Sequence, residues 1–116
     1  HAIFDMIRNL YDIQLEVTGI HGIAAAKTNE DAISIMAQSI ENVLGVDNVD
    51  NPLVTPGGDD FHFYTIKNPQ LKATMLGLGC GLKPGLHHPN MTFDHDALMN
   101  GVNVLYETIL QTYRLN

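Results

Sequence analysis

The chain has 116 residues, 45% of them hydrophobic, and a formal net charge of −7 at pH 7 from 13 acidic residues against 6 Lys and Arg. One domain of this length buries roughly two-thirds of the surface that its unfolded chain exposes. The acidic balance would repel a phosphate backbone, and no apolar run reaches the about 18 residues of a membrane span, so we expect neither a nucleic-acid nor a membrane partner.

The first two segments change from a helical to an alternating pattern. Ile3, Ile7 and Leu10 recur at i, i+4 and i+7, and this spacing predicts an amphipathic helix. Apolar and polar residues then alternate over residues 13–18, which is typical of a half-buried strand.

A second helix is predicted from about Asn29 to Leu44. Either Thr28 or Asn29 can cap its first turn, and acidic residues follow in that turn, where the helix dipole favours them. Gly45 stands where a helix commonly ends. The apolar face of this helix consists of Ile33, Met36, Ile40, Val43 and Leu44.

The second half of the chain predicts two strands and two helices. Residues 49–54 are suited to an edge strand because Pro52 interrupts them, and the apolar run 71–79 is suited to a buried strand. A short helix is expected after the glycines of PGGDDFHFY, and a last helix, capped by Asp94, has an apolar stripe of Leu98, Val102, Leu105 and Ile109. The order αβαβαβα predicts an α/β layered fold.

An adjacent histidine pair, His87 and His88, lies in the segment GLHHPN between a glycine and a proline. Pro89 and Gly85 are typical of a surface turn, whereas imidazole is a common zinc ligand. Neighbouring side chains on an extended segment point to opposite sides, so at most one histidine is expected to reach a common site.

Two further segments are candidates for chemistry. Gly57 and Gly58 could expose backbone N–H groups to an anion, or Asp59 and Asp60 could satisfy those donors as ordinary helix caps. Cys80 is the only cysteine, so it forms no internal disulfide and no thiolate zinc cluster, and we interpret it as an inert, buried thiol. A single cysteine fits a reducing, cytoplasmic setting.

The order of these segments resembles one family of enzymes. PGGDDFHFY, an apolar segment and then LHHPNMTFDHDALMNGVNVLYE are similar to the C-terminal part of the catalytic domain in zinc metallopeptidases and amidohydrolases. This family includes aminoacylases, hippurate hydrolases and auxin-conjugate hydrolases. The matching residues are Gly57–Phe61, His87–Pro89, Asp94 and Gly101, and the similarity extends over nearly the whole chain. Asp59 departs from the family's usual Glu, and residues 90–92 depart from the commoner aromatic and basic residues.

The resemblance implies a fold, a reaction and a site. The fold would be a three-layer α/β/α, zinc-exopeptidase-like catalytic domain. The reaction would be cleavage of the amide bond of an N-acyl amino acid or small peptide-like substrate by water activated between two divalent metal ions, zinc or another. The resemblance assigns a metal-ligand role to His87 and a substrate-side role to Gly57, Gly58, Asp59 and Asp60, and no catalytic residue to this chain.

The remaining metal ligands and the general base of that family come from an N-terminal segment whose motifs do not occur here. We therefore expect residues 1–116 to be the C-terminal segment of such a domain. The N-terminal segment and the lid domain, which this sequence does not include, would be its partners. A metal site needs about three protein ligands, so the isolated chain is expected to hold no metal and to be inactive. The alternative is a non-catalytic binding domain, or a homo-oligomer that associates through exposed apolar faces.

Overall fold

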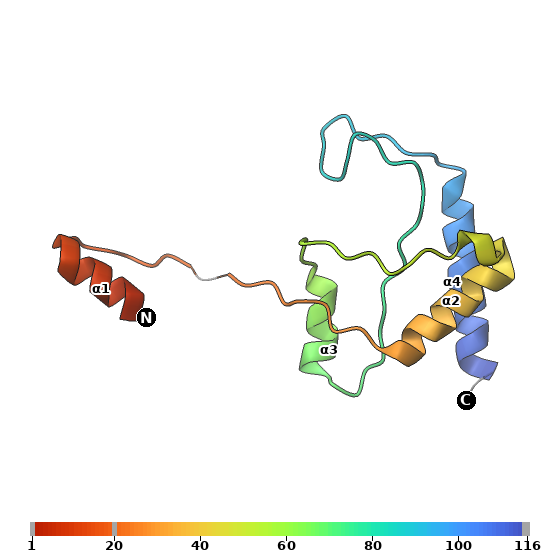
Figure 1. Ribbon diagram of the computed structural model, residues 1–116, viewed down its shortest axis with the longest axis horizontal. Helices are drawn as coiled ribbons and strands as arrows, with labels where there is room; N and C mark the ends of the chain where they lie inside the picture. Colours follow the sequence, from red (N-terminus) through yellow and green to blue (C-terminus); the bar gives the residue numbers. More distant parts are fainter. Residues whose placement is uncertain (1, 20, 115–116) are drawn as a thin grey trace.

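The computed structural model describes residues 2–19 and 21–114, and these residues form helices joined by long extended segments. Its elements, in chain order, are α1 (Ala2–Tyr11), α2 (Glu30–Leu44), η1 (Val46–Asn48), η2 (Asp60–His62), α3 (Phe63–Lys67) and α4 (Ala97–Arg114) (Figure 1). The radius of gyration is 20.4 Å, whereas a compact chain of this length would have about 13 Å. The chain is therefore open rather than densely packed.

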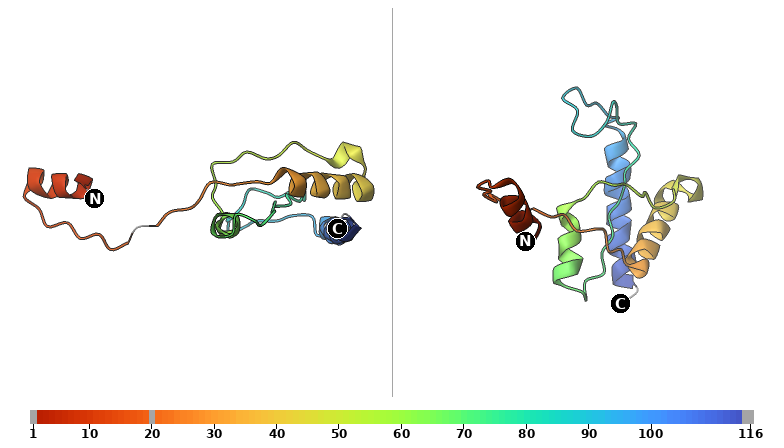
Figure 2. Two further views of the ribbon diagram at one scale, coloured as in Figure 1. Left: turned by 90° about the horizontal axis from the view of Figure 1, so that it is seen from below. Right: turned by 60° about the vertical axis from the view of Figure 1, so that its left-hand side comes forward.

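Helices α2 and α4 form the packed part of the molecule, and they lie side by side in each view (Figure 2). Their contact buries Val104, which is 1% exposed, and Ser39, which is 0% exposed. The Ser39 hydroxyl donates to the carbonyl of Ile35 at 2.7 Å, so this buried polar group is satisfied within its own helix. Two small residues of α4, Ala97 and Gly101, are also buried, and Gly101 lies beside the side chain of Leu78 in segment 71–79.

The ends of α2 confirm the sequence-based boundaries. Asn29, not Thr28, is the N-cap, because its Oδ1 accepts a hydrogen bond from the backbone N–H of Ala32 at 3.0 Å. At the other end, Gly45 has φ of 89°, a conformation that glycine adopts without strain, and its N–H donates to the carbonyl of Glu41.

The α/β fold and its αβαβαβα order are wrong. Segments 13–18, 49–54 and 71–79 are extended, but the described residues contain no sheet, and their one β-bridge joins Lys83 to Thr92. Alternating or continuous hydrophobicity reports which side chains avoid water, whereas a strand also needs a neighbouring backbone with which to exchange hydrogen bonds. In the described part of the chain, no second backbone forms a ladder of hydrogen bonds with these segments, and Leu53 and Val54 are 87% and 94% exposed.

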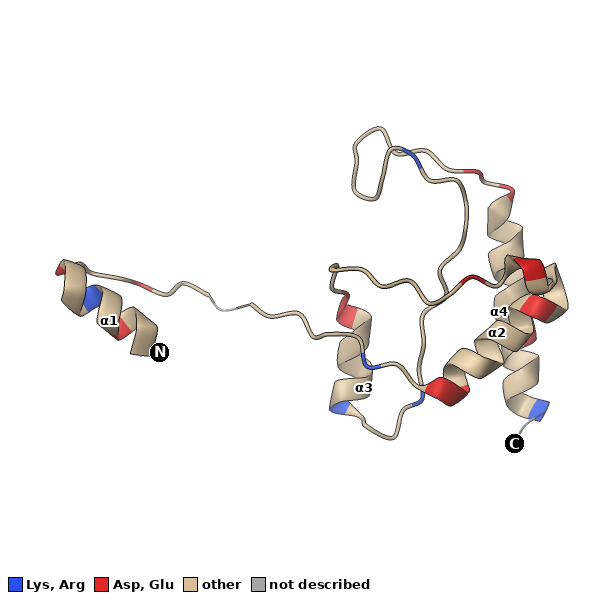
Figure 3. Ribbon diagram, viewed as in Figure 1, with Lys and Arg blue, Asp and Glu red and all other residues tan. Residues whose placement is uncertain are grey.

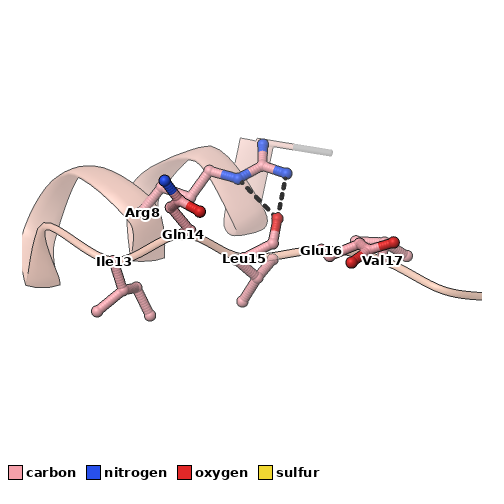
Figure 4. A pocket seen from close by; sticks show the side chains of 6 residues that line it. All are labelled: Arg8, Ile13, Gln14, Leu15, Glu16 and Val17. Atoms are coloured by element: carbon pink, nitrogen blue, oxygen red, sulfur yellow. Dashed lines mark hydrogen bonds between the residues drawn. The ribbon is translucent and has the colours of Figure 1, made fainter.

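Segment 13–18 shows what replaces the expected ladder. Arg8 of α1 folds back on it, and its Nε and Nη2 donate to the carbonyl of Leu15 at 3.2 and 2.7 Å (Figure 4). A side chain thus takes the place of a strand partner. Helix α1 contacts no other helix in the described part of the chain, and it stands apart from α2–α4 in Figures 1 and 2.

Helix α4 forms as predicted, but its apolar stripe does not face α2. The side chains of this stripe are 49–55% exposed, and they are Leu98, Val102, Leu105 and Ile109. The buried positions of α4 are instead Ala97, Gly101 and Val104. Helix α4 therefore has apolar groups on two faces, of which α2 covers one.

The charged residues are spread without a basic stripe among the described residues. Acidic residues gather on α2 and its flanks, whereas Lys and Arg occur singly (Figure 3). One ion pair, from Lys72 Nζ to Asp31 Oδ2 at 2.6 Å, ties segment 71–79 to the start of α2, and its exposure limits it to about 0–1 kcal/mol. Of the helices in the described ranges, none has the length and apolar character needed to cross a bilayer.

Candidate functional site

The predicted metal-ligand segment lies at the tip of a loop whose base is closed by backbone hydrogen bonds. Lys83 N–H donates to the carbonyl of Thr92 at 2.9 Å, and Thr92 N–H donates to the carbonyl of Lys83 at 2.8 Å. One step further out, Asp94 N–H donates to the carbonyl of Cys80 at 2.8 Å. This loop projects beyond the end of α4 (Figure 1), so the chain presents it as a preformed unit.

His87 has the less common backbone conformation of the pair. Its φ is 64°, in the left-handed region, where a residue with a Cβ costs roughly 1–2 kcal/mol more than glycine. The side chain is exposed, and neither ring nitrogen bonds to another described residue. Strain held at an exposed imidazole is the kind of feature that occurs at binding sites.

His88 has a bonding partner, unlike His87. Its Nδ1 accepts a hydrogen bond from the backbone N–H of Asn90 at 3.1 Å. The backbone of His88 is also engaged, since its N–H donates to Gly85 at 3.4 Å and its carbonyl accepts from Met91 at 3.0 Å. The sequence reading missed this role. The available signal was an acceptor side chain directly before Pro89, which is typical of a turn.

In the glycine–aspartate segment, Gly57–Asp60, the two carboxylates differ in their hydrogen bonds. Asp59 is the N-cap of η2, and its Oδ1 accepts from the backbone N–H of Phe61 at 2.8 Å. Asp60 is exposed, and its carboxylate bonds to no other described residue. Gly57 N–H donates to Thr55 Oγ1 at 3.2 Å, and a Cβ on Gly58 would overlap the Ile23 side chain. The segment is therefore a local capping structure with one free carboxylate.

Two further histidines, His62 and His95, lie against aromatic rings. The ring of His62 lies edge-on to Phe61, with centroids 5.7 Å apart, and that of His95 lies 4.8 Å from Phe93. Cys80 is a free thiol of intermediate exposure, less buried than expected. No hydrogen bond joins its Sγ to a basic side chain among the residues that the structure describes.

The described residues do not assemble a metal site. They contain no group of three or more His, Cys, Asp or Glu side chains that could hold an ion, whereas zinc needs about three protein ligands. No hydrogen bond or ion pair among residues 2–19 and 21–114 joins the glycine–aspartate segment to His87. This chain alone thus does not fit the metal that its sequence resemblance implies.

Two hollows lie away from these segments. The first, of about 610 Å³, is the space between Arg8 and residues 13–17 (Figure 4). The second, of about 690 Å³, lies between α2, α4 and segment 71–79, and its wall includes Asp31, Met36, Lys72, Thr108 and Thr112. Neither wall includes a predicted site residue.

Comparisons with known proteins place the sequence in a family. The sequence profile described as Peptidase family M20/M25/M40 matches residues 8–111. A protein named "Putative glutamate--cysteine ligase 2-3", from Rhodococcus jostii (strain RHA1), is 30% identical over 97 residues, which are 82% of this chain and 12% of that protein. The chain thus spans a small part of the length of this curated relative. No solved structure matches the chain.

Proposed function

The chain belongs to peptidase family M20/M25/M40, and we propose that it is the C-terminal segment of the catalytic domain of a metal-dependent hydrolase. The substrate class is an N-acyl amino acid or a small peptide-like molecule, and the bond cleaved is its amide. The observation that carries the proposal is the family match over residues 8–111, together with the loop that presents His87 at its exposed tip. The chain covers only 12% of the Rhodococcus protein, so the ligase activity in that protein's name does not extend to this chain.

His87 is the one metal ligand that this chain contributes. The closed base between Lys83 and Thr92 fixes the loop, and the backbone of His87 is held in a conformation that would relax if nothing required it. The other ligands and the general base belong to the rest of the protein, so no catalytic step is assigned to this chain.

The glycine–aspartate segment lies on the substrate side of the site. Asp60 is the residue proposed to meet the substrate, because Asp59 already caps η2. Gly57 and Gly58 support this segment, the first through Thr55 and the second by allowing Ile23 to approach.

The partners of the chain are the N-terminal catalytic segment and the lid domain of the same protein. Two unpaired apolar surfaces support contacts of this kind, namely the stripe of α4 and the amphipathic helix α1. Exposure of these apolar side chains to water would raise the free energy of the chain if no partner covered them. The exposed side chains are Ile3, Met6 and Leu10 on α1 and Leu105 and Ile109 on α4.

Hydrolysis of N-acetyl amino acids tests the proposal. The full-length protein that contains this chain should hold zinc or another divalent metal and hydrolyse such substrates, and His87→Ala should remove both properties. His95→Ala, an exposed histidine outside the loop, is the matched control and should retain both. The isolated chain should be inactive with added zinc, and turnover that a chelator abolishes would contradict this.

A second candidate function is self-association without catalysis, and the exposed stripe of α4 favours it. Sedimentation of the isolated chain distinguishes the two candidates. A concentration-dependent dimer that Leu105→Glu dissociates, together with no metal in the full-length protein, would favour the assembly function.

A further inference from the structure

Among the described residues, five side chains accept a hydrogen bond from the backbone N–H two residues ahead. Three of them are Asp or Asn: Asp59 to Phe61 at 2.8 Å, Asn68 to Gln70 at 3.3 Å and Asp94 to Asp96 at 3.0 Å. These residue types commonly form such turns, because their carbonyl or carboxylate oxygen reaches the local backbone. The fourth acceptor is the hydroxyl of Thr55, which bonds to Gly57 at 3.2 Å, and threonine also forms turns of this kind. The fifth is a histidine, His88, which bonds to Asn90 at 3.1 Å.

The geometry points to His88 as a positioning residue that shapes the turn carrying His87, and we propose that it is not itself a metal ligand. Nδ1 of histidine is bonded to Cγ, as is Oδ1 of asparagine, so the two acceptors are equally far from the backbone in bonds. Pro89, between acceptor and donor, fixes its own φ and lacks an N–H, which leaves the N–H of Asn90 as the group to be satisfied.

This bond stabilises the strained backbone beside it. The left-handed φ of His87, 64°, is held between two turn bonds, from His88 N–H to Gly85 and from Met91 N–H to His88. The ring of His88 adds a third bond to the same few residues. Without it, the exposed tip would have less to offset the conformational cost at His87.

The bond also divides the two histidines by chemistry. A neutral imidazole that accepts at Nδ1 has its proton on Nε2, and a nitrogen that holds a proton cannot bind a metal. His88 therefore has one nitrogen committed to Asn90 and the other protonated. His87 has both nitrogens free of described partners, so the adjacent pair consists of one ligand and one turn residue.

Amide exchange and ring ¹⁵N NMR of the chain itself test the turn, using His88→Asn and His88→Ala. In the wild-type chain, the ring shifts should identify an unprotonated Nδ1 and a protonated Nε2. His88→Asn should keep the protection of the Asn90 amide, whereas His88→Ala should speed its exchange about five- to tenfold, as expected for one net hydrogen bond. Equal exchange in the wild type and the alanine variant would overturn the proposal.

The role toward His87 rests on the proposed function, and it is tested in the full-length protein by metal content and kcat/KM. His88→Asn should retain the metal and the activity, His88→Ala should weaken metal binding, and His87→Asn should abolish it. If His88→Asn loses the metal as completely as His87→Asn, His88 is a ligand and the proposal fails. If His87→Asn changes neither property, the proposed function fails instead, and the NMR result still decides the turn.

Discussion

Asn42 of α2 donates a hydrogen bond from its Nδ2 to Oε1 of Glu107 on α4 at 3.1 Å, and the two residues are 65 positions apart in the sequence. Gln111 donates to the same oxygen at 2.8 Å, and the Arg114 guanidinium lies 3.9 Å from it. The hydrogen bonds from Asn42 and then Gln111, with the charge of Arg114, lower the pKa of Glu107 below its ordinary value of 4.5. The contact between α2 and α4 thus includes a carboxylate that its neighbours keep ionised.

The first prediction is that the α2–α4 contact weakens in acid. The pKa of Glu107 is lower in the folded chain than in the unfolded chain. Ionised Glu107 therefore stabilises the folded chain fully above pH 4.5, and this stabilisation is lost as the pH falls below 4.5 and through the folded pKa. Thermal unfolding, followed by circular dichroism at 222 nm between pH 3 and 7, should show a lower midpoint temperature below pH 4.5 than above it.

Glu107→Gln separates this effect from general acid denaturation. The amide cannot titrate, so the variant should lose part of the acid-dependent drop while the other carboxylates still produce theirs. Asp47→Asn, which removes an acid of η1, is the matched control and should follow the wild-type curve. Identical pH profiles for wild type and Glu107→Gln would contradict the prediction.

The second prediction concerns Gly101 of α4. A Cβ at this position would lie 3.1 Å from Cδ2 of Leu78. Segment 71–79 therefore packs against α4 at Gly101, which has no side chain. Gly101→Ala adds about 1 kcal/mol of helix propensity, and the flexible Leu78 side chain can move by the small amount required. Gly101→Val adds two further methyl groups on that Cβ and should destabilise the chain by about 1–3 kcal/mol.

Chemical denaturation of the two Gly101 variants measures this difference. The double variant Gly101→Val with Leu78→Ala should recover part of the lost stability, because the smaller side chain makes room for the valine. A valine variant as stable as the alanine variant would show that Leu78 does not pack on the helix.

The third prediction distinguishes the two possible caps of α2. Asn29→Ala removes the acceptor for the backbone N–H of Ala32 and should lower the stability of the helix by about 1 kcal/mol. Thr28→Ala should change it by less than about 0.5 kcal/mol, because Thr28 caps nothing. The helical signal as a function of temperature measures both, and an equal loss in the two variants would contradict the prediction.

The helices could be read from the sequence because their signals are local. The cap at Asn29, the stop at Gly45 and the apolar spacing of α1 each depend on neighbours within a few residues, and all three are found in the structure. The resemblance to the M20 family was also recoverable, since it depends on the order of short segments, and the profile match confirms it at the family level.

The strands could not be read in this way because a strand is a relation between two segments. Residues 13–18 have the alternation of a strand, but the carbonyl of Leu15 is met by Arg8 rather than by a second backbone. The role of His88 was missed for a related reason. Its residue type suggested a ligand, whereas its bond to Asn90 depends on the turn that Pro89 helps to form.

The last prediction is that glycine is better tolerated than alanine at His87. Both substitutions remove the imidazole, but only alanine keeps a Cβ in the left-handed region, so His87→Gly should be more stable than His87→Ala by about 1 kcal/mol. Exchange of the Lys83 and Thr92 amides, which close the loop, measures this difference. Leu86, whose φ is not positive, provides the opposite control. The Leu86→Gly variant should be less stable than the Leu86→Ala variant. A loop in which glycine is inferior at both positions would mean that His87 is not held in the left-handed conformation in solution.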